Sequence, residues 1–273
     1  MNLLKLSTYA KTIIFRSLFI VGLLFSSSVS AEVLQVTPRD GVTIKLLLDV
    51  PEAINAKTPV AILFPGGHGR LVLEDDGSFT KLNGNFLVRS RSRFVENGIA
   101  IAVLDAPSDH QDKAGLTFDY RSSSEHFEDI GKVIFAVRAR FPGQPIWLVG
   151  TSRGSTSAAN AAANLKTDMP DGLILTSSVG IAFKKGGNVT DFNLDAIRIP
   201  TLVVHHLEDG CAATTISGAR AIYDALTNAA RRDLIEIDGG RTSGDPCKGG
   251  SYHGFLGIEN DVIDKITAWM KGS

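Results

Sequence analysis

Hydrophobic residues gather into six short runs along the central and C-terminal parts of the chain, with longer amphipathic stretches between them. The runs are rich in Val, Ile and Leu, as is typical of strands buried on both faces of a parallel sheet. They comprise residues 60–64, 99–104, 146–149, 173–176, 202–205 and 234–237. Before them, two apolar stretches within residues 33–50 are joined by Pro38-Arg39-Asp40-Gly41, whose Asp-Gly pair predicts an antiparallel hairpin.

The stretches between the runs have the spacing of helices. In the longest, apolar residues recur every three or four positions, and Ser122 and Glu125 fit a capping box at its start. These apolar residues are Phe127, Ile130, Ile134, Val137 and Phe141. Further helices are expected within residues 86–95, ended by Gly98, and within 216–226 and 262–269. Strands that alternate with helices predict an α/β fold: a mostly parallel sheet with an antiparallel N-terminal edge hairpin and helices on both faces.

The first 31 residues have the pattern of an export signal. Lys5, Lys11 and Arg16 precede an apolar run at residues 18–25, and Val29-Ser30-Ala31 supplies the small residues of a cleavage site. The run is shorter than the roughly 20 residues that span a bilayer, which disfavours an uncleaved anchor. We therefore expect a signal peptide at residues 1–31, one domain at residues 32–273, a periplasmic or extracellular location, and no membrane association after cleavage.

Export changes the meaning of the only two cysteines, Cys211 and Cys247. In an oxidising compartment a disulfide between them is the expected state, with two unrelated buried thiols as the alternative. The net charge of -1 offers no broad basic surface for nucleic acid. A small molecule is the expected partner, and the oligomeric state is not readable from the sequence.

Gly150-Thr151-Ser152-Arg153-Gly154 follows a predicted strand and precedes a predicted helix. This is the setting of a nucleophile elbow, in which glycines permit a turn so tight that the serine hydroxyl stands clear of the sheet. The alternative is a serine that only caps the helix. The location between strand and helix favours Ser152 as a nucleophile.

A serine nucleophile needs a base, and the base needs a carboxylate that fixes its tautomer. His253 is the expected base because it lies after the last predicted strand, where a loop can fold back over the elbow. Asp209, just after the strand at residues 202–205, is the expected carboxylate; Glu208 is the second choice and Asp238 a weaker one. A Cys211–Cys247 bridge would join the loops that carry Asp209 and His253.

The chain order Ser152, Asp209, His253 resembles that of the α/β-hydrolases, over essentially the whole mature length. The surroundings of these residues are similar to those in exported bacterial hydrolases of unassigned substrate. The resemblance implies an acyl-enzyme mechanism with an oxyanion hole. One donor is then the N–H of Arg153, and the other is that of Gly67 or, as an alternative, His68, in a glycine loop that has Pro65 where the family's histidine stands.

Other chemistries have weaker support. No dinucleotide or P-loop motif follows the first parallel strand, so no cofactor is expected. A zinc site can be composed from histidines 205, 206 and 253 with Asp209, but none of the usual local ligand spacings is present, so no metal is expected. Residues 177–200, where a cap would be inserted, are too few for a cap domain, which predicts an open site.

These features together predict an exported serine hydrolase that cleaves a soluble carboxylic ester. An amidase, a peptidase or a thioesterase would use the same residues. A binding protein that keeps the scaffold without turnover is the alternative outside the enzymes.

Overall fold

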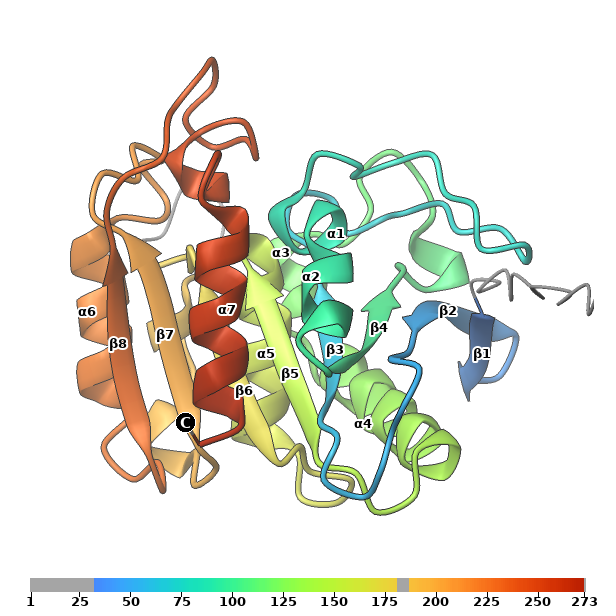
Figure 1. Ribbon diagram of the computed structural model, residues 1–273. Coiled ribbons are helices and arrows are strands. Elements are labelled where there is room, and N and C mark those ends of the chain that lie inside the picture. Colours follow the sequence, from blue (N-terminus) through green and yellow to red (C-terminus); the bar gives the residue numbers. More distant parts are fainter. Residues whose placement is uncertain (1–31, 181–186, 273) are drawn as a thin grey trace, which may run out of the picture. The chain divides into compact units, whose positions relative to one another are not determined.

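A computed structural model describes residues 32–180 and 187–272 (Figure 1). Its eight strands form one sheet in the order β1-β2-β4-β3-β5-β6-β7-β8. β1 pairs antiparallel with β2, and β2 with β4, while all other neighbours are parallel. The strands are β1 (Glu32–Arg39), β2 (Val42–Asp49), β3 (Val60–Phe64), β4 (Ala100–Leu104), β5 (Ile146–Thr151), β6 (Gly172–Thr176), β7 (Thr201–His206) and β8 (Arg232–Ile237). The predicted sheet and its N-terminal hairpin are confirmed; the expected signal peptide lies outside the described residues.

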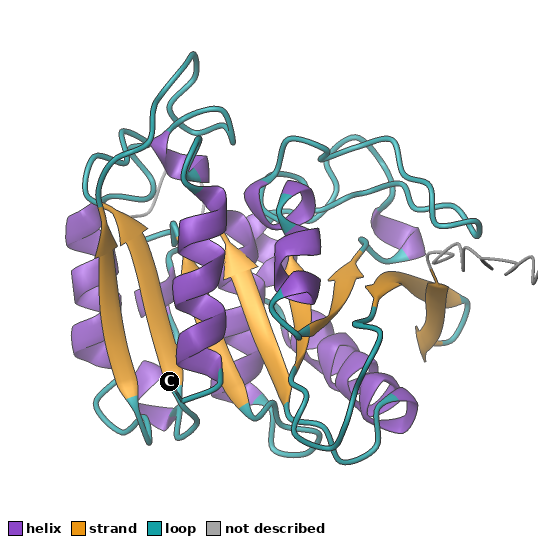
Figure 2. Cartoon of the chain, viewed as in Figure 1, coloured by secondary structure: helices purple, strands orange, loops and turns teal. Residues whose placement is uncertain are grey.

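Helices cover both faces of the sheet, which explains why every residue of the central strands is buried (Figure 2). One face packs against α4 (Ser124–Arg140), α5 (Arg153–Asn164) and α6 (Ile216–Ala225). The other packs against α1 (Phe86–Arg89), α2 (Arg91–Glu96) and α7 (Glu259–Met270). The remaining elements are α3 (Phe118–Arg121) and single 3-10 turns at Ser108–His110, Val189–Asp191, Leu194–Ala196 and Tyr252–Gly254.

Two local predictions need correction. Ser123, not Ser122, caps α4: its hydroxyl accepts the N–H of His126 at 3.2 Å, because Ser122 is already used to end α3. The single helix expected within residues 86–95 is two short helices that meet at Ser90. Both differences arise from short helical turns whose packing, rather than their periodicity, decides where they begin.

In the residues that the structure describes, the loops at the carboxyl ends of the parallel strands carry no cap domain. Within residues 177–200, the part that the structure describes contains only the 3-10 turns at Val189–Asp191 and Leu194–Ala196. A search of the described residues finds no helix with the length and apolar character that a membrane crossing requires. The predicted open site is therefore consistent with the fold.

Cys211 and Cys247 form the expected disulfide, which links the loop after β7 to the loop between β8 and α7. The bridge closes a sequence separation of 36 residues. Closing a loop of this length restricts the unfolded chain and stabilises the fold by roughly 3–4 kcal/mol in the chain-entropy model.

We expect the double variant Cys211→Ser/Cys247→Ser to lose about 3–4 kcal/mol of unfolding free energy in urea titrations, because its unfolded chain regains that freedom. Reducing the wild-type protein with dithiothreitol serves as the control and should give a matching loss. A loss below about 1 kcal/mol in both experiments would show that the bridge contributes little to stability.

His126 lies at the start of α4 and is 1 % exposed. Its Nε2 is 2.8 Å from the hydroxyl of Ser157. Burial lowers the pKa of His126 well below the ordinary value of 6.5, and the nearby charges of Arg121, His110 and Arg39 lower it further. In the native state the ring is therefore neutral at pH values where the unfolded chain has already bound a proton.

Because this pKa is lower in the folded state, stability is fully present above about pH 6.5 and falls as the pH drops below it, by about 1.4 kcal/mol per pH unit for one such group. We expect His126→Asn to reduce that slope by about half a proton at pH 6.5 and by about 0.9 proton at pH 5.5, measured by urea unfolding. A loss of unfolding free energy that is equal at all pH values does not change the slope, so the comparison of slopes isolates the effect of the proton. Equal slopes in the two proteins would contradict a neutral His126.

Candidate active site

Ser152 stands at the sharp turn between β5 and α5, as predicted. Its backbone has φ 53° and ψ -127°, a strained conformation that a non-glycine residue adopts at a cost of about 1–3 kcal/mol. A Cβ on Gly150 would lie 2.5 Å from the carbonyl oxygen of Gly154, and a Cβ on Gly154 would collide with that of Phe64. Both glycines of the predicted elbow are thus required by close backbone packing, and the strain lies at the serine itself.

His253 and Asp209 are brought together by two different loops. His253 lies in the 3-10 turn before α7, and Asp209 follows β7. Nδ1 of His253 is 2.9 Å from Oδ2 of Asp209, and both residues are buried, at 5 % and 8 % exposure. The other carboxylate oxygen, Oδ1, accepts the N–H of Cys211 at 2.9 Å. The aspartate is therefore held on both oxygens and orients the imidazole.

Thr214 belongs to this pair, although the sequence gave no reason to single it out. Its hydroxyl is 2.9 Å from Oδ2 of Asp209 and 3.0 Å from Nδ1 of His253. The carbonyl oxygen of Thr214 is 2.7 Å from Nε2 of His205. A threonine five residues after an aspartate is too common a pattern to signal a function, so only the folded loop reveals this contact.

His205 lies fully buried beneath the same loop. A carbonyl oxygen can only accept, so the contact with Thr214 requires the proton of His205 to be on Nε2. Burial lowers the pKa of His205, outweighing the opposing charge of Asp209. His205 is thus a neutral support for the loop, and Nε2 lies 3.5 Å from Oδ2 of Asp209.

The alternative carboxylates lie elsewhere. Glu208 and Asp238 are exposed, and among the described residues neither is bonded to His253. His206 uses both ring nitrogens, accepting the N–H of Glu208 at Nδ1 and bonding the carbonyl oxygen of Gly239 through Nε2. Each histidine considered as a zinc ligand is therefore hydrogen-bonded to protein groups, His205 and His253 around Thr214 and His206 to Gly239 and Glu208.

The glycine loop after β3 lies directly against the nucleophile. A Cβ on Gly66 would lie 2.8 Å from Cβ of Ser152, so a side chain is excluded at that position. Gly67 and His68 follow and line the same hollow as Ser152. Among the described residues, neither of their N–H groups donates a hydrogen bond within the protein. Arg153 is the first residue of α5, and its N–H has no partner within the helix.

Arg121 supports this loop from inside the protein. It is 1 % exposed and donates to the hydroxyl of Ser157 at 2.6 Å, to the carbonyl oxygen of Pro65 at 3.2 Å and, more weakly, to that of Leu116 at 3.4 Å. Burial lowers the pKa of Arg121 to about 9, with a further contribution from the charge of Arg153. A buried guanidinium therefore lies behind the glycine loop without a carboxylate partner among the described residues.

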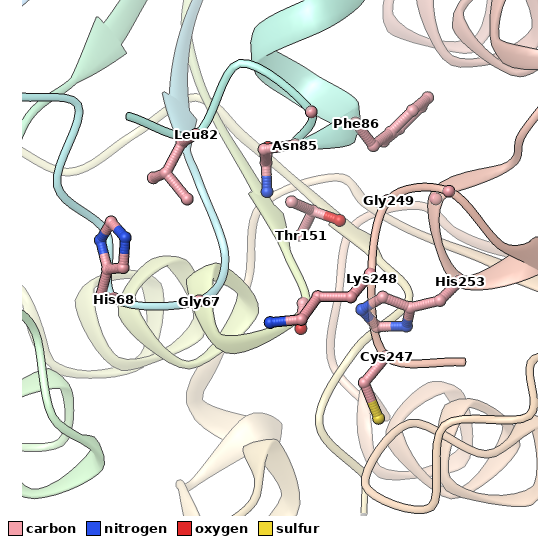
Figure 3. A pocket seen from close by; sticks show the side chains of 14 residues that line it. Gly67, His68, Leu82, Asn85, Phe86, Thr151, Cys247, Lys248, Gly249 and His253 are labelled. Carbon is pink, nitrogen blue, oxygen red and sulfur yellow. The ribbon is translucent and has the colours of Figure 1, made fainter. Parts of the chain in front are cut away.

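Two adjoining hollows of about 370 and 390 Å³ form one cleft around Ser152. Gly67, His68 and Lys248 line both, and His253 lines the first (Figure 3). Among the described residues no hydrogen bond joins the Ser152 hydroxyl to His253, a contact that in many hydrolases tightens only when substrate binds. The cleft thus holds the predicted nucleophile, base and both candidate oxyanion donors of the glycine loop.

Within the described part of the chain, one group of possible metal ligands lies outside the cleft. Oxygen and nitrogen atoms of Asp109, His110 and Glu125 come within 4.8 Å of one another. Nη1 of Arg39 lies 3.0 Å from Asp109 and 3.5 Å from Glu125, so both carboxylates already have a guanidinium as a partner. We attribute a structural role to this cluster.

No protein-family model matches the chain, and neither does any curated protein. Solved structures do resemble it. XC6422 of Xanthomonas campestris, described as a serine hydrolase without a lid, is 19% identical with a TM-score of 0.58, over 89% of this chain and 94% of that one. Est1E of Butyrivibrio proteoclasticus is 17% identical with a TM-score of 0.60, over 88% and 98%.

A dienelactone hydrolase of Anabaena variabilis gives a TM-score of 0.62 at 14% identity, over 89% of this chain and 97% of that one. Such low identities establish the fold alone. The strand order, the elbow and these likenesses agree, and the chain has the α/β-hydrolase fold.

Proposed function

We propose that this protein is a serine hydrolase that cleaves a carboxylic ester of a small, soluble molecule through an acyl-enzyme intermediate. The observation that carries the proposal is the His253–Asp209 hydrogen bond of 2.9 Å in a cleft that also contains a strained Ser152. Strain at a non-glycine residue persists only where surrounding structure enforces it, and such residues cluster at functional sites. A binding scaffold without turnover has no need of this geometry.

In the proposed mechanism, Oγ of Ser152 attacks the ester carbonyl while Nε2 of His253 takes its proton. Asp209 accepts the Nδ1–H of His253 and stabilises the imidazolium that forms. The N–H groups of Arg153 and Gly67 bind the oxyanion, with His68 as the alternative to Gly67. His253 then protonates the departing alcohol, and water, activated by the same histidine, releases the acid and regenerates Ser152. Neither a metal nor an organic cofactor takes part.

We propose an ester, rather than an amide or a thioester, as the substrate because of the ligand and the activity named for two similar structures. They include a further structure of Est1E with ferulic acid bound and an esterase domain from Rhodothermus marinus. The open cleft suits a modest, soluble substrate rather than lipid at an interface. Amidase, peptidase and thioesterase activities use the same residues, and a substrate panel separates them.

We also propose that the protein acts after export to the periplasm or the extracellular space. The basic, apolar and small-residue pattern of residues 1–31 supports this location. The Cys211–Cys247 disulfide is compatible with it, because such bridges persist in oxidising compartments.

We expect a fluorophosphonate probe to label residues 32–273 at Ser152, as located by peptide mass spectrometry. Ser152→Ala should abolish labelling, and His253→Ala should slow it by about 10³-fold or more because the hydroxyl loses its base. Protein of the same preparation that has not been exposed to the probe should hydrolyse phenyl butanoate faster than the matching anilide. A folded protein that the probe does not modify would contradict the proposal and favour the binding scaffold.

Thr214→Val should lower kcat/KM for the same ester by about 10- to 100-fold, with most of the effect on kcat, because Asp209 loses one charge-assisted hydrogen bond. Thr214→Ser keeps the hydroxyl and should retain most activity. Circular dichroism and urea unfolding separate this effect from loss of structure. Equal activity of the Val and Ser variants would show that the hydroxyl does not assist the base.

A further inference from the structure

The charges that line the cleft are all of one sign. Lys248 lines both hollows, and Lys113 and Arg153 line the second, whereas none of the lining residues within the described chain is Asp or Glu. The chain as a whole has 28 basic and 29 acidic residues. The positive lining is therefore a local feature that the overall composition does not explain.

None of these three side chains forms a salt bridge among the described residues, although eight other Lys and Arg residues do. Two acidic residues lie near them in sequence. Oδ1 of Asp112 accepts the N–H groups of Ala114 and Gly115, and Oδ1 of Asp245 accepts that of Cys247. These carboxylates stabilise turns, do not line the cleft and are not in salt bridges with its cations.

Each cation reaches the cleft from a different part of the fold. The guanidinium of Arg153 lies 4.8 Å from the centre of the Phe118 ring, a cation–π contact that holds it beside Ser152. Lys248 follows the disulfide-bonded Cys247, and its side chain extends into the pocket between His68 and His253 (Figure 3). Lys113 comes from the loop before α3. Three separate segments thus direct positive charge toward one space.

Two neighbouring groups have lowered pKa values. The pKa of His68 is lowered first by burial, then by the charges of Arg70, Lys81 and Arg121, and least by that of Lys248. The charge of Arg153 contributes, after burial, to the lowered pKa of Arg121. Both shifts are consistent with a positive potential around the glycine loop.

We infer that the substrate is an anionic ester, with a carboxylate or another oxyanion besides the scissile bond, and that Lys248, together with Lys113 or Arg153, binds the negative group. This inference rests on the proposed function and specifies its substrate class. All three side chains are exposed and free to contact a ligand, and cations of one sign that converge on a concave site raise the local concentration of an anion there. A hydrogen bond to a charged group selects the anionic substrate by roughly 10- to 100-fold.

Two pairs of esters test the inference on the wild-type protein. Monomethyl adipate and methyl hexanoate differ by a carboxylate on the acyl side; 4-carboxyphenyl butanoate and phenyl butanoate differ by one on the alcohol side. We expect kcat/KM to favour the anionic member of at least one pair by about 10- to 100-fold, and 0.5 M NaCl to reduce that preference. Equal or higher kcat/KM for the neutral member of both pairs would overturn the inference.

Substitutions identify the residues responsible. Lys248→Met should lower the anionic-to-neutral ratio of kcat/KM by about tenfold. Lys113→Met should lower it only when the second hollow binds the negative group. Lys166→Met, an exposed lysine after the far end of α5, is the matched control and should keep the wild-type ratio. A wild-type ratio in the Lys248 and Lys113 variants alike would also overturn the inference.

The same preparations distinguish this failure from failure of the proposed function. Enzyme that fluorophosphonate labels at Ser152, but that does not prefer anionic esters, retains the hydrolase proposal and loses only the substrate class. Protein that is folded and unlabelled fails the proposed function itself.

Discussion

The close approach of three backbone segments around Ser152 is the constraint on which the site depends. The end of β3, the end of β5 and the start of α5 meet where Gly154 packs against the carbonyl of Phe64 and Gly66 packs against Ser152. Only residues without side chains permit this packing. It fixes the strained serine and, in the same step, holds the glycine loop at its side, so the nucleophile and the candidate oxyanion donors are built as one unit.

The second half of the site depends on loops at the carboxyl ends of β7 and β8. These strands are neighbours in the sheet, so the segments that follow them meet although 44 residues separate Asp209 from His253. Both oxygens of Asp209 are bonded, and Thr214 links the aspartate to neutral His205 below it. The disulfide ties the same two loops together. The orientation of the imidazole is therefore determined by a rigid, buried network rather than by a single hydrogen bond.

Much of this arrangement could be predicted from the sequence because it depends on residues that are close together along the chain. Apolar runs located the strands, the Gly150–Gly154 motif located the elbow, and the order of residues along an α/β chain indicated Asp209 and His253. Thr214 and the break at Ser90 could not be predicted, since both depend on which segments meet after folding. The choice between Ser122 and Ser123 as the helix cap likewise required knowing where α3 ends.

The positive charge of the cleft also depends on which segments meet after folding. Lys113, Arg153 and Lys248 form no cluster in the sequence, and a net charge of -1 gives no hint of them. The fold unites them in front of Ser152, while the buried Arg121 adds a positive charge behind the glycine loop through its bond to Pro65. In the proposed function, these positive charges favour the oxyanion of the tetrahedral intermediate for every substrate. Faster hydrolysis of one ester therefore does not show that the cleft binds an anionic group of that ester. Only the ratio between esters that share a scissile bond and differ by one charge isolates binding of the anionic group from stabilisation of the reacting carbonyl.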